Sequence, residues 1–171
     1  YTAQVDAVEI GGFFNIVQKN VHAVQIGGLF NVVGGNVDGF QIAGLYNYAG
    51  DSVKGLQIGG LTNFNKSANK GLQIGGLYNQ NQDFKGLQIA GLVNKSKDIN
   101  KGMQISGIVS RARAIGKGMQ LSGVANSAKT INGAQVSGLL NFAKNINGFQ
   151  LGIVNISDSL EGVSIGPINY S

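Results

Sequence analysis

The feature that most constrains how this chain can fold is a short motif that returns every 14–16 residues. In residues 72–79 it reads LQIGGLYN: an apolar residue, Gln, a second apolar residue, two small residues, an apolar residue, a variable residue and Asn. Such a period is typical of repeat proteins, in which each copy buries part of the copy before it. Eleven copies begin at Val8, Val24, Phe40, Leu56, Leu72, Leu87, Met103, Met119, Ala134, Phe149 and Val163.

The copies occupy nearly the whole chain without a linker, so we expect residues 1–171 to form a single repeat domain. The chain begins at Tyr1 instead of Met, and we expect it to be part of a longer protein. It has no Cys, which excludes disulfides, thiolate metal sites and cysteine nucleophiles. No stretch approaches the ~20 apolar residues of a membrane-spanning helix.

Two apolar columns flank Gln in most copies, with Glu9 and Ser164 in its place at the two ends. An apolar, polar, apolar order is the period of a strand with one buried face. We therefore expect both apolar columns to point into the core and the polar column to form a ladder on the surface. That column consists of Gln25, Gln41, Gln57, Gln73, Gln88, Gln104, Gln120, Gln135 and Gln150.

The pair of small residues interrupts this alternation, as at Gly75 and Gly76. One inserted residue turns every later side chain to the other face unless a bulge or corner absorbs it. Glycine suits such a site because it tolerates a positive φ. We expect a bulged bend between two short strands, after which Leu77 points inward, Tyr78 outward and Asn79 inward.

The Asn column predicts a ladder of side-chain amides. A lone buried Asn carries a desolvation penalty, but Asn residues stacked at one strand spacing can donate to one another. This arrangement requires successive copies to lie directly on top of each other. The column consists of Asn15, Asn31, Asn47, Asn63, Asn79, Asn94, Asn126, Asn141, Asn155 and Asn169, and Ser110 interrupts it.

A third apolar column completes each copy and is followed within two residues by Gly. Its members are Val37, Val53, Phe84, Ile99, Ile115, Ile131, Ile146 and Leu160. Each copy then holds about three short strands joined by turns. The fold class that fits is all-β: a parallel β-solenoid, or β-helix, of about 10–11 coils at ~4.8 Å, forming a rod roughly 50 Å long.

The repeats resemble a known bacterial family. Residues 24–31 (VQIGGLFN), 40–47 (FQIAGLYN), 87–94 (LQIAGLVN) and 149–166 (FQLGIVNISDSLEGVSIG) are similar to the GVQIGGLFN-like repeats of surface-repeat proteins from Bacteroidetes and of leptospiral surface-repeat lipoproteins. The likeness extends from about Val8 to Asn169. It implies a bacterial cell-surface, outer membrane-associated or extracellular location, and it brings no catalytic residues.

Reactive groups do not converge in the sequence, so we expect no catalytic, cofactor-binding or metal site and no enzymatic activity. A single His, His22, makes neither a metal site nor a catalytic triad, and we expect it in a solvated turn. Asp38 and Asp51 lie near coil corners and could approach each other across adjacent coils. A polysaccharide-cleaving solenoid therefore stays open as an alternative.

A basic ladder of five Lys residues occupies the place just before the Gly that starts five consecutive copies. Cations stacked one coil apart repel each other, which is typical of a solvated corner that discourages sheet pairing. The same ladder could instead dock an acidic polysaccharide or lipopolysaccharide. Nucleic acid is disfavoured, because aromatic residues are not interleaved with the cations. The ladder consists of Lys54, Lys70, Lys85, Lys101 and Lys117.

Aromatic residues gather in the early copies, directly before or directly after the Asn column. If the alternation holds, they form an exposed apolar face, and soluble monomers rarely leave a large patch of this kind uncovered. We name this set the aromatic face: Phe14, Phe30, Tyr46, Tyr48, Phe64 and Tyr78. The competing interpretation places this column in the core.

These features favour a non-enzymatic, surface-associated β-solenoid that serves as a rigid spacer or an interaction and assembly platform. We expect a protein partner or self-association through the aromatic face or the coil ends. An ice-binding solenoid is a further alternative, because an exposed Gln ladder would be flat and regular. Only Thr2, Thr62 and Thr130 are available for the ranked Thr array expected in such a protein.

Overall fold

A computed structural model of the chain describes residues 2–171 and contains strands without helices over that range. The strands are β1 (Val8–Gly11), β2 (Phe14–Val17), β3 (Val24–Gly27), β4 (Phe30–Val33), β5 (Val37–Ala43), β6 (Tyr46–Ala49), β7 (Val53–Gly59), β8 (Thr62–Asn65), β9 (Asn69–Gly75), β10 (Tyr78–Ala90), β11 (Val93–Ser106), β12 (Val109–Arg111), β13 (Ala114–Ser122), β14 (Ala125–Ser137), β15 (Leu140–Leu151), β16 (Val154–Ile165) and β17 (Ile168–Tyr170). Neighbouring strands pair in parallel, with each copy of the motif in register with the next. The predicted parallel β-solenoid of about ten coils is confirmed.

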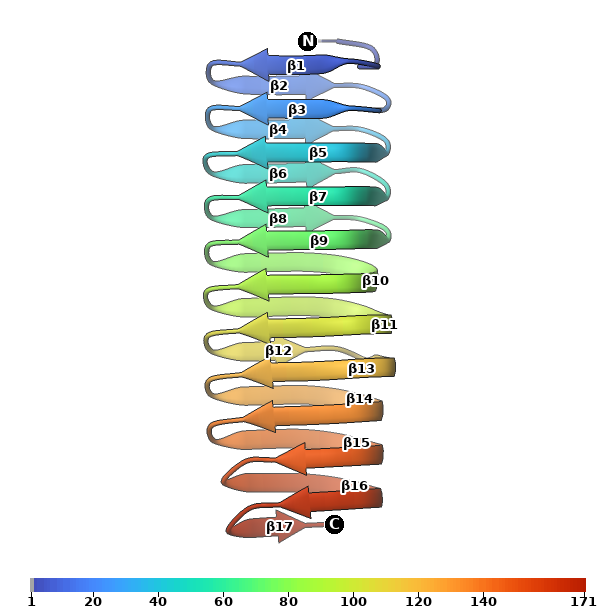
Figure 1. The fold of residues 1–171 in the computed structure, drawn as a ribbon, viewed down its shortest axis with the longest axis vertical. Helices are drawn as coiled ribbons and strands as arrows, with labels where there is room; N and C mark the ends of the chain where they lie inside the picture. The colour runs from blue at the N-terminus through green and yellow to red at the C-terminus, as the bar shows by residue number, and fades with distance from the viewer. Residues whose placement is uncertain (1) are drawn as a thin grey trace.

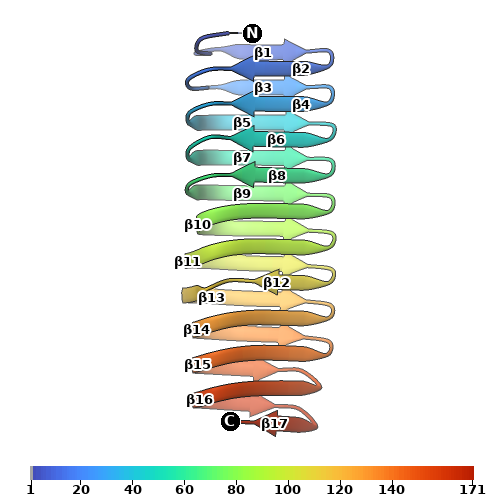
Figure 2. The same ribbon diagram turned by 180° about the vertical axis from the view of Figure 1, so that it is seen from behind.

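The coils are flattened into two parallel layers that face each other (Figure 1). We call them the front layer, which contains β1, β3, β5, β7 and β9, and the back layer, which contains β2, β4, β6 and β8. Farther along, long strands such as β10 start in the back layer and finish in the front layer. Strands nearest the viewer run to the left and those behind run to the right while the chain descends, so the coil is right-handed (Figures 1 and 2).

The third apolar column lies in the core as predicted, but it does not form a third strand. Val37 and Val53 begin the front-layer strands β5 and β7, and Gly39 and Gly55 bend these strands with φ values of 140° and 122°. Most coils therefore contain two layers joined by a glycine corner on one side and a tight turn on the other. The predicted count of three strands per copy is wrong.

The Gln column points into the rod, contrary to the sequence-based prediction. Its nine Gln side chains are fully buried between the layers. Each donates from Nε2 to the side-chain oxygen one coil earlier, as in Gln73 to Gln57 at 2.8 Å and Gln88 to Gln73 at 2.9 Å. The first bond of the ladder runs from Gln25 to the Glu9 carboxylate at 2.8 Å. Because the ladder satisfies its own amides, it occupies the interior, and the two flanking apolar columns point outward.

The Asn ladder forms as predicted in the back layer. Asn47 donates to Asn63 and Asn63 to Asn79, both at 2.9 Å. Asn63 also donates to the carbonyl oxygen of Ile74 at 2.6 Å, which ties the back layer to the front layer. Asn donors point toward the following coil and Gln donors toward the preceding one, so the dipoles of the two ladders oppose each other.

Apolar clusters fill the rest of the interior. One runs from Val5 to Val53, and the second includes Phe84, Ile99 and Ile146. Asn69 separates the two clusters, because it occupies the third apolar column as a fully buried amide. Among residues 2–171, neither its side-chain nitrogen nor its side-chain oxygen has a hydrogen-bond partner. The interior therefore combines an amide part with an apolar part.

The pair of small residues forms the tight turn between layers, so the predicted bend is confirmed but its physical reason differs. Gly59 is buried and Gly60 exposed, and neither has a positive φ. A Cβ on Gly59 would clash with the carbonyl oxygen of Thr62, and one on Gly60 with that of Gly44. Close approach of backbones therefore selects these small residues. The turn also leaves Leu77 exposed, so its predicted inward orientation is wrong.

We predict that Asn63→Leu lowers the free energy of unfolding by about 2–4 kcal/mol, because it leaves the buried oxygen of Asn79 without its donor and cuts the tie to Ile74. Chemical denaturation followed by circular dichroism measures the change. Asn100→Leu is the control: Asn100 is exposed, and a change within about 0.5 kcal/mol is expected there. Equal losses in the two variants would contradict a stabilising ladder.

Gly76→Ala and Gly12→Ala test the close-approach explanation at the same place in two copies. A Cβ on Gly76 would clash with the carbonyl oxygen of Gly60, whereas a Cβ on Gly12, in the first coil, has no atom of the described residues within 4 Å. We expect Gly76→Ala to cost about 1–3 kcal/mol of unfolding free energy and Gly12→Ala to be nearly neutral. If both are neutral in denaturant unfolding, close packing does not explain the small residues.

Candidate functional site

The front layer presents a flat apolar surface to the outside. It consists of the two columns that flank Gln, and we call it the aliphatic face. Leu56, Ile58, Leu72 and Ile74 are half-buried there by their neighbours in adjacent coils. None of the residues in the two columns is charged: Val8, Val24, Phe40, Leu56, Leu72, Leu87, Met103, Met119, Ala134, Phe149 and Val163, with Ile10, Ile26, Ile42, Ile58, Ile74, Ile89, Ile105, Leu121, Val136, Leu151 and Ile165.

Two different edges border the aliphatic face. On one side the tight turns expose Leu61, Leu77 and Leu92 by 41–44%. On the other side the basic ladder stands at the glycine corners. The aliphatic face is therefore an uncharged plane with leucines along one edge and lysines along the other.

The basic ladder has the predicted geometry. Lys54, Lys70, Lys85 and Lys101 are aligned across consecutive coils, and Lys117 is exposed at the same corner beside a register shift. Lys54 lies 3.9 Å from the Asp38 carboxylate. Among residues 2–171, no carboxylate lies within ion-pair distance of the other four.

The aromatic face lies on the outside of the back layer, so the interpretation that placed it in the core is wrong. Phe14 and Phe30 are exposed, and Tyr46, Tyr48, Phe64 and Tyr78 are half-buried. The ring centroids of Tyr48 and Phe64 are 5.8 Å apart with nearly parallel planes. Burial raises the pKa of Tyr46 and of Tyr78 above the usual value, and the neighbouring Tyr48 adds to the effect at Tyr46.

The structure does not bring the candidate reactive groups together. Asp38 is the register partner of Lys54 and pairs with it, whereas the backbone nitrogen of Asp51 donates to the carbonyl oxygen of Gly35. His22 lies 2.8 Å from the Asp6 carboxylate in an exposed turn. Hydrogen bonds from Gln4 and from His22 lower the pKa of Asp6. Over the described range, no group of three or more His, Asp or Glu side chains could hold a metal ion.

Burial of the Gln column removes the structural argument for ice binding, because that argument required an exposed amide plane. Sequence reasoning missed the aliphatic face because it placed the Gln column on the surface and the two flanking apolar columns in the core. A usable signal existed: Gln is almost invariant between copies, whereas solvent-exposed positions usually vary.

The coil ends carry open strand edges. Within the described residues, β1 pairs with β3 alone and β17 with β16 alone. Such edges can accept another strand. Association through the coil ends therefore stays a prediction.

No protein-family model, curated protein or solved structure matches the chain. Residues 2–171 contain no helix long and apolar enough to cross a membrane.

The raised Tyr pKa values predict an alkaline loss of stability. Folding holds the phenol protons of Tyr46 and Tyr78 more tightly, so this contribution is present below the unfolded pKa of 10.0 and is lost as the pH rises through the higher folded value. We expect the unfolding free energy to fall more steeply between about pH 9 and about pH 11 in the wild type than in a Tyr46→Phe/Tyr78→Phe variant. Denaturant titrations at both pH values measure this, and equal slopes would refute it.

Proposed function

We propose that the chain is a non-enzymatic β-solenoid of the bacterial envelope or cell surface that serves as a rigid assembly platform, and that it pairs with a second copy of itself through the aliphatic face. The observation that carries the proposal is the reversed polarity of the front layer. Its amides are inside, and its aliphatic side chains are outside. A charge-free plane of this length is rarely left uncovered in a soluble protein.

The dimensions of the aliphatic face suit a dimer. About ten coils at ~4.8 Å and four strand residues at ~3.3 Å give a plane of roughly 50 by 13 Å, or about 650 Å². A standard interface buries about 800 Å² on each partner, and the exposed Leu61, Leu77 and Leu92 along the edge extend the plane toward that value.

The two edges favour a parallel pair with its two-fold axis along the rod. This symmetry places the lysine edge of one copy over the leucine edge of the other, so the two lysine rows do not meet. Lysine stems can then cover the exposed Leu side chains while their ammonium groups stay in water. An antiparallel pair would bring the two lysine rows together and would be opposed by their repulsion.

The resemblance of the repeats to bacterial surface-repeat proteins supports the envelope location. Uniformity of the coils supports a role without catalysis, because reactive groups usually converge where a repeat is irregular. The dispersal of Asp38 and His22 into separate ion pairs adds to this argument.

Light scattering tests the pairing over a wide concentration range. We expect the wild type to reach twice the monomer mass, and Ile74→Gln/Ile89→Gln to stay monomeric because polar groups then enter the apolar contact. The matched control is Val93→Gln/Val109→Gln, which changes two half-buried outward residues of the back layer in consecutive coils. The control should dimerise like the wild type.

Three outcomes would overturn the pairing. A wild type that remains monomeric at every concentration removes the second copy as the occupant of the aliphatic face. Open-ended growth that persists in Ile74→Gln/Ile89→Gln assigns association to the coil ends. Equal loss of dimer in the control variant shows that the aliphatic face is not the specific contact.

A further inference from the structure

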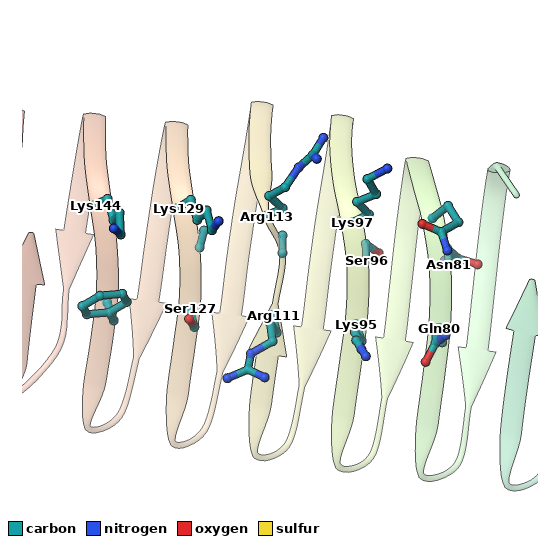
Figure 3. A pocket seen from close by; sticks show the side chains of 14 residues that line it. Gln80, Asn81, Lys95, Ser96, Lys97, Arg111, Arg113, Ser127, Lys129 and Lys144 are labelled. Atoms are coloured by element: carbon teal, nitrogen blue, oxygen red, sulfur yellow. The ribbon is translucent and has the colours of Figure 1, made fainter. Parts of the chain in front are cut away.

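A groove lies on the outside of the back layer, in the second half of the rod (Figure 3). Its volume is about 460 Å³, and its lining comes from five consecutive coils between β10 and β15. The groove therefore runs along the axis of the rod, across the strands. It is separate from both the aliphatic face and the basic ladder, which belong to the front layer and its corner.

Two rows of outward side chains form the walls, and Figure 3 shows them on neighbouring strands. The first row is Gln80, Lys95, Arg111, Ser127 and Phe142, and its members are register partners from coil to coil. The second row is Gln82, Lys97, Arg113, Lys129 and Lys144. Between the rows, the side chains of Asn81, Ser96, Ala112 and Ala128 are buried, so no side chain stands up from the floor there.

The lining is strongly cationic. It contains no carboxylate and six cations: Lys95, Lys97, Arg111, Arg113, Lys129 and Lys144. Asp98 neutralises one of them, with 3.0 and 2.6 Å hydrogen bonds from the Arg113 guanidinium. No other ion pair among residues 2–171 involves the groove.

These cations oppose the stability of the sheet instead of supporting it. Lys95 and Arg111 are direct register partners, and like charges placed opposite each other are destabilising. The solenoid does not require cations in this column, because Tyr48, Phe64 and Ser127 occupy it in other coils. A ligand of opposite charge would account for the concentration of cations here.

We propose that this groove binds a linear polysaccharide that carries carboxylate or sulfate groups, with the sugar chain lying along the rod axis. Cations recur from coil to coil at ~4.8 Å, a spacing comparable with one sugar of an extended acidic polymer. Gln80, Gln82 and Ser127 supply donors and acceptors for sugar hydroxyls, and Phe142 offers an exposed apolar ring at one end.

The arrangement favours a polysaccharide over a single-stranded nucleic acid. Nucleic-acid grooves combine cations with aromatic side chains on which successive bases stack. Of the residues that line this groove, only Phe142 is aromatic, and it lies beyond the last cation of its own row. The stacked Tyr48 and Phe64 belong to the earlier coils, outside the groove.

Binding of polygalacturonate, measured by isothermal titration calorimetry, tests the proposal. The groove variant is Lys95→Gln/Arg111→Gln/Lys129→Gln. The control variant is Lys70→Gln/Lys85→Gln/Lys101→Gln, which removes the same net charge from the basic ladder. We expect the groove variant to lose affinity by at least about tenfold and the control to change little, because direct charged contacts outweigh distant ones. The wild-type affinity should fall with salt, and more steeply than that of the groove variant.

Each contrary outcome overturns the assignment. If the wild type does not bind polygalacturonate, the groove is not a site for an acidic polysaccharide. Equal losses in the two variants show attraction to net charge without a site, and tighter binding of oligothymidylate assigns the groove to nucleic acid. The unfolding midpoints of both variants show whether either is misfolded. Neutral dextran should not compete with polygalacturonate for the groove. Ile74→Gln/Ile89→Gln should bind polygalacturonate like the wild type, because its changes lie on the other layer. A failure of the polysaccharide proposal can therefore be told apart from a failure of the proposed dimer.

Discussion

Hydrogen bonding between buried side-chain amides is the interaction on which the whole solenoid depends. In the Gln ladder and the Asn ladder the amides of neighbouring coils bond to one another, as between Gln57 and Gln73 or between Asn47 and Asn63, with Ser110 as the one interruption of the Asn ladder between Asn15 and Asn169. A buried amide without these neighbours would pay its full desolvation cost. The ladders therefore enforce the coil-to-coil register, and their opposed directions keep the summed dipole of the interior small.

Filling much of the interior with amides determines what the surface can display. Space between the layers is taken by Gln57, Asn63 and the small residues at the turn, so Leu56 and Ile58 must lie outside. The rod consequently carries its apolar side chains on a long plane on one layer, and aromatic and cationic side chains in succession on the other. Such a separation of surfaces on one stiff support suits a molecule that holds several partners at fixed spacing.

Much of the architecture could be predicted from the repeat. The period, the parallel register, the inward Asn column, the buried third apolar column and the aligned lysines all follow from copies placed directly on one another. Hydrophobicity alone predicts the wrong orientation for Gln41 and Gln57, because it favours burying the adjacent aliphatic residues. The only sequence signal for the inward orientation is that Gln hardly varies between copies. That preference fails where a polar side chain can satisfy its own hydrogen bonds in a stack.

The sequence by itself determined which side chains share a face, because alternation along a strand has a period of two and does not depend on the surroundings. Only the tertiary structure decided which of the two faces is inside, since the opposite layer and the neighbouring coils supply the partners that make an amide core stable. The basic groove also depends on the tertiary structure. Lys95, Arg111 and Lys129 are separated by 16 and 18 residues in the chain, and the stacking of coils makes them walls of one groove.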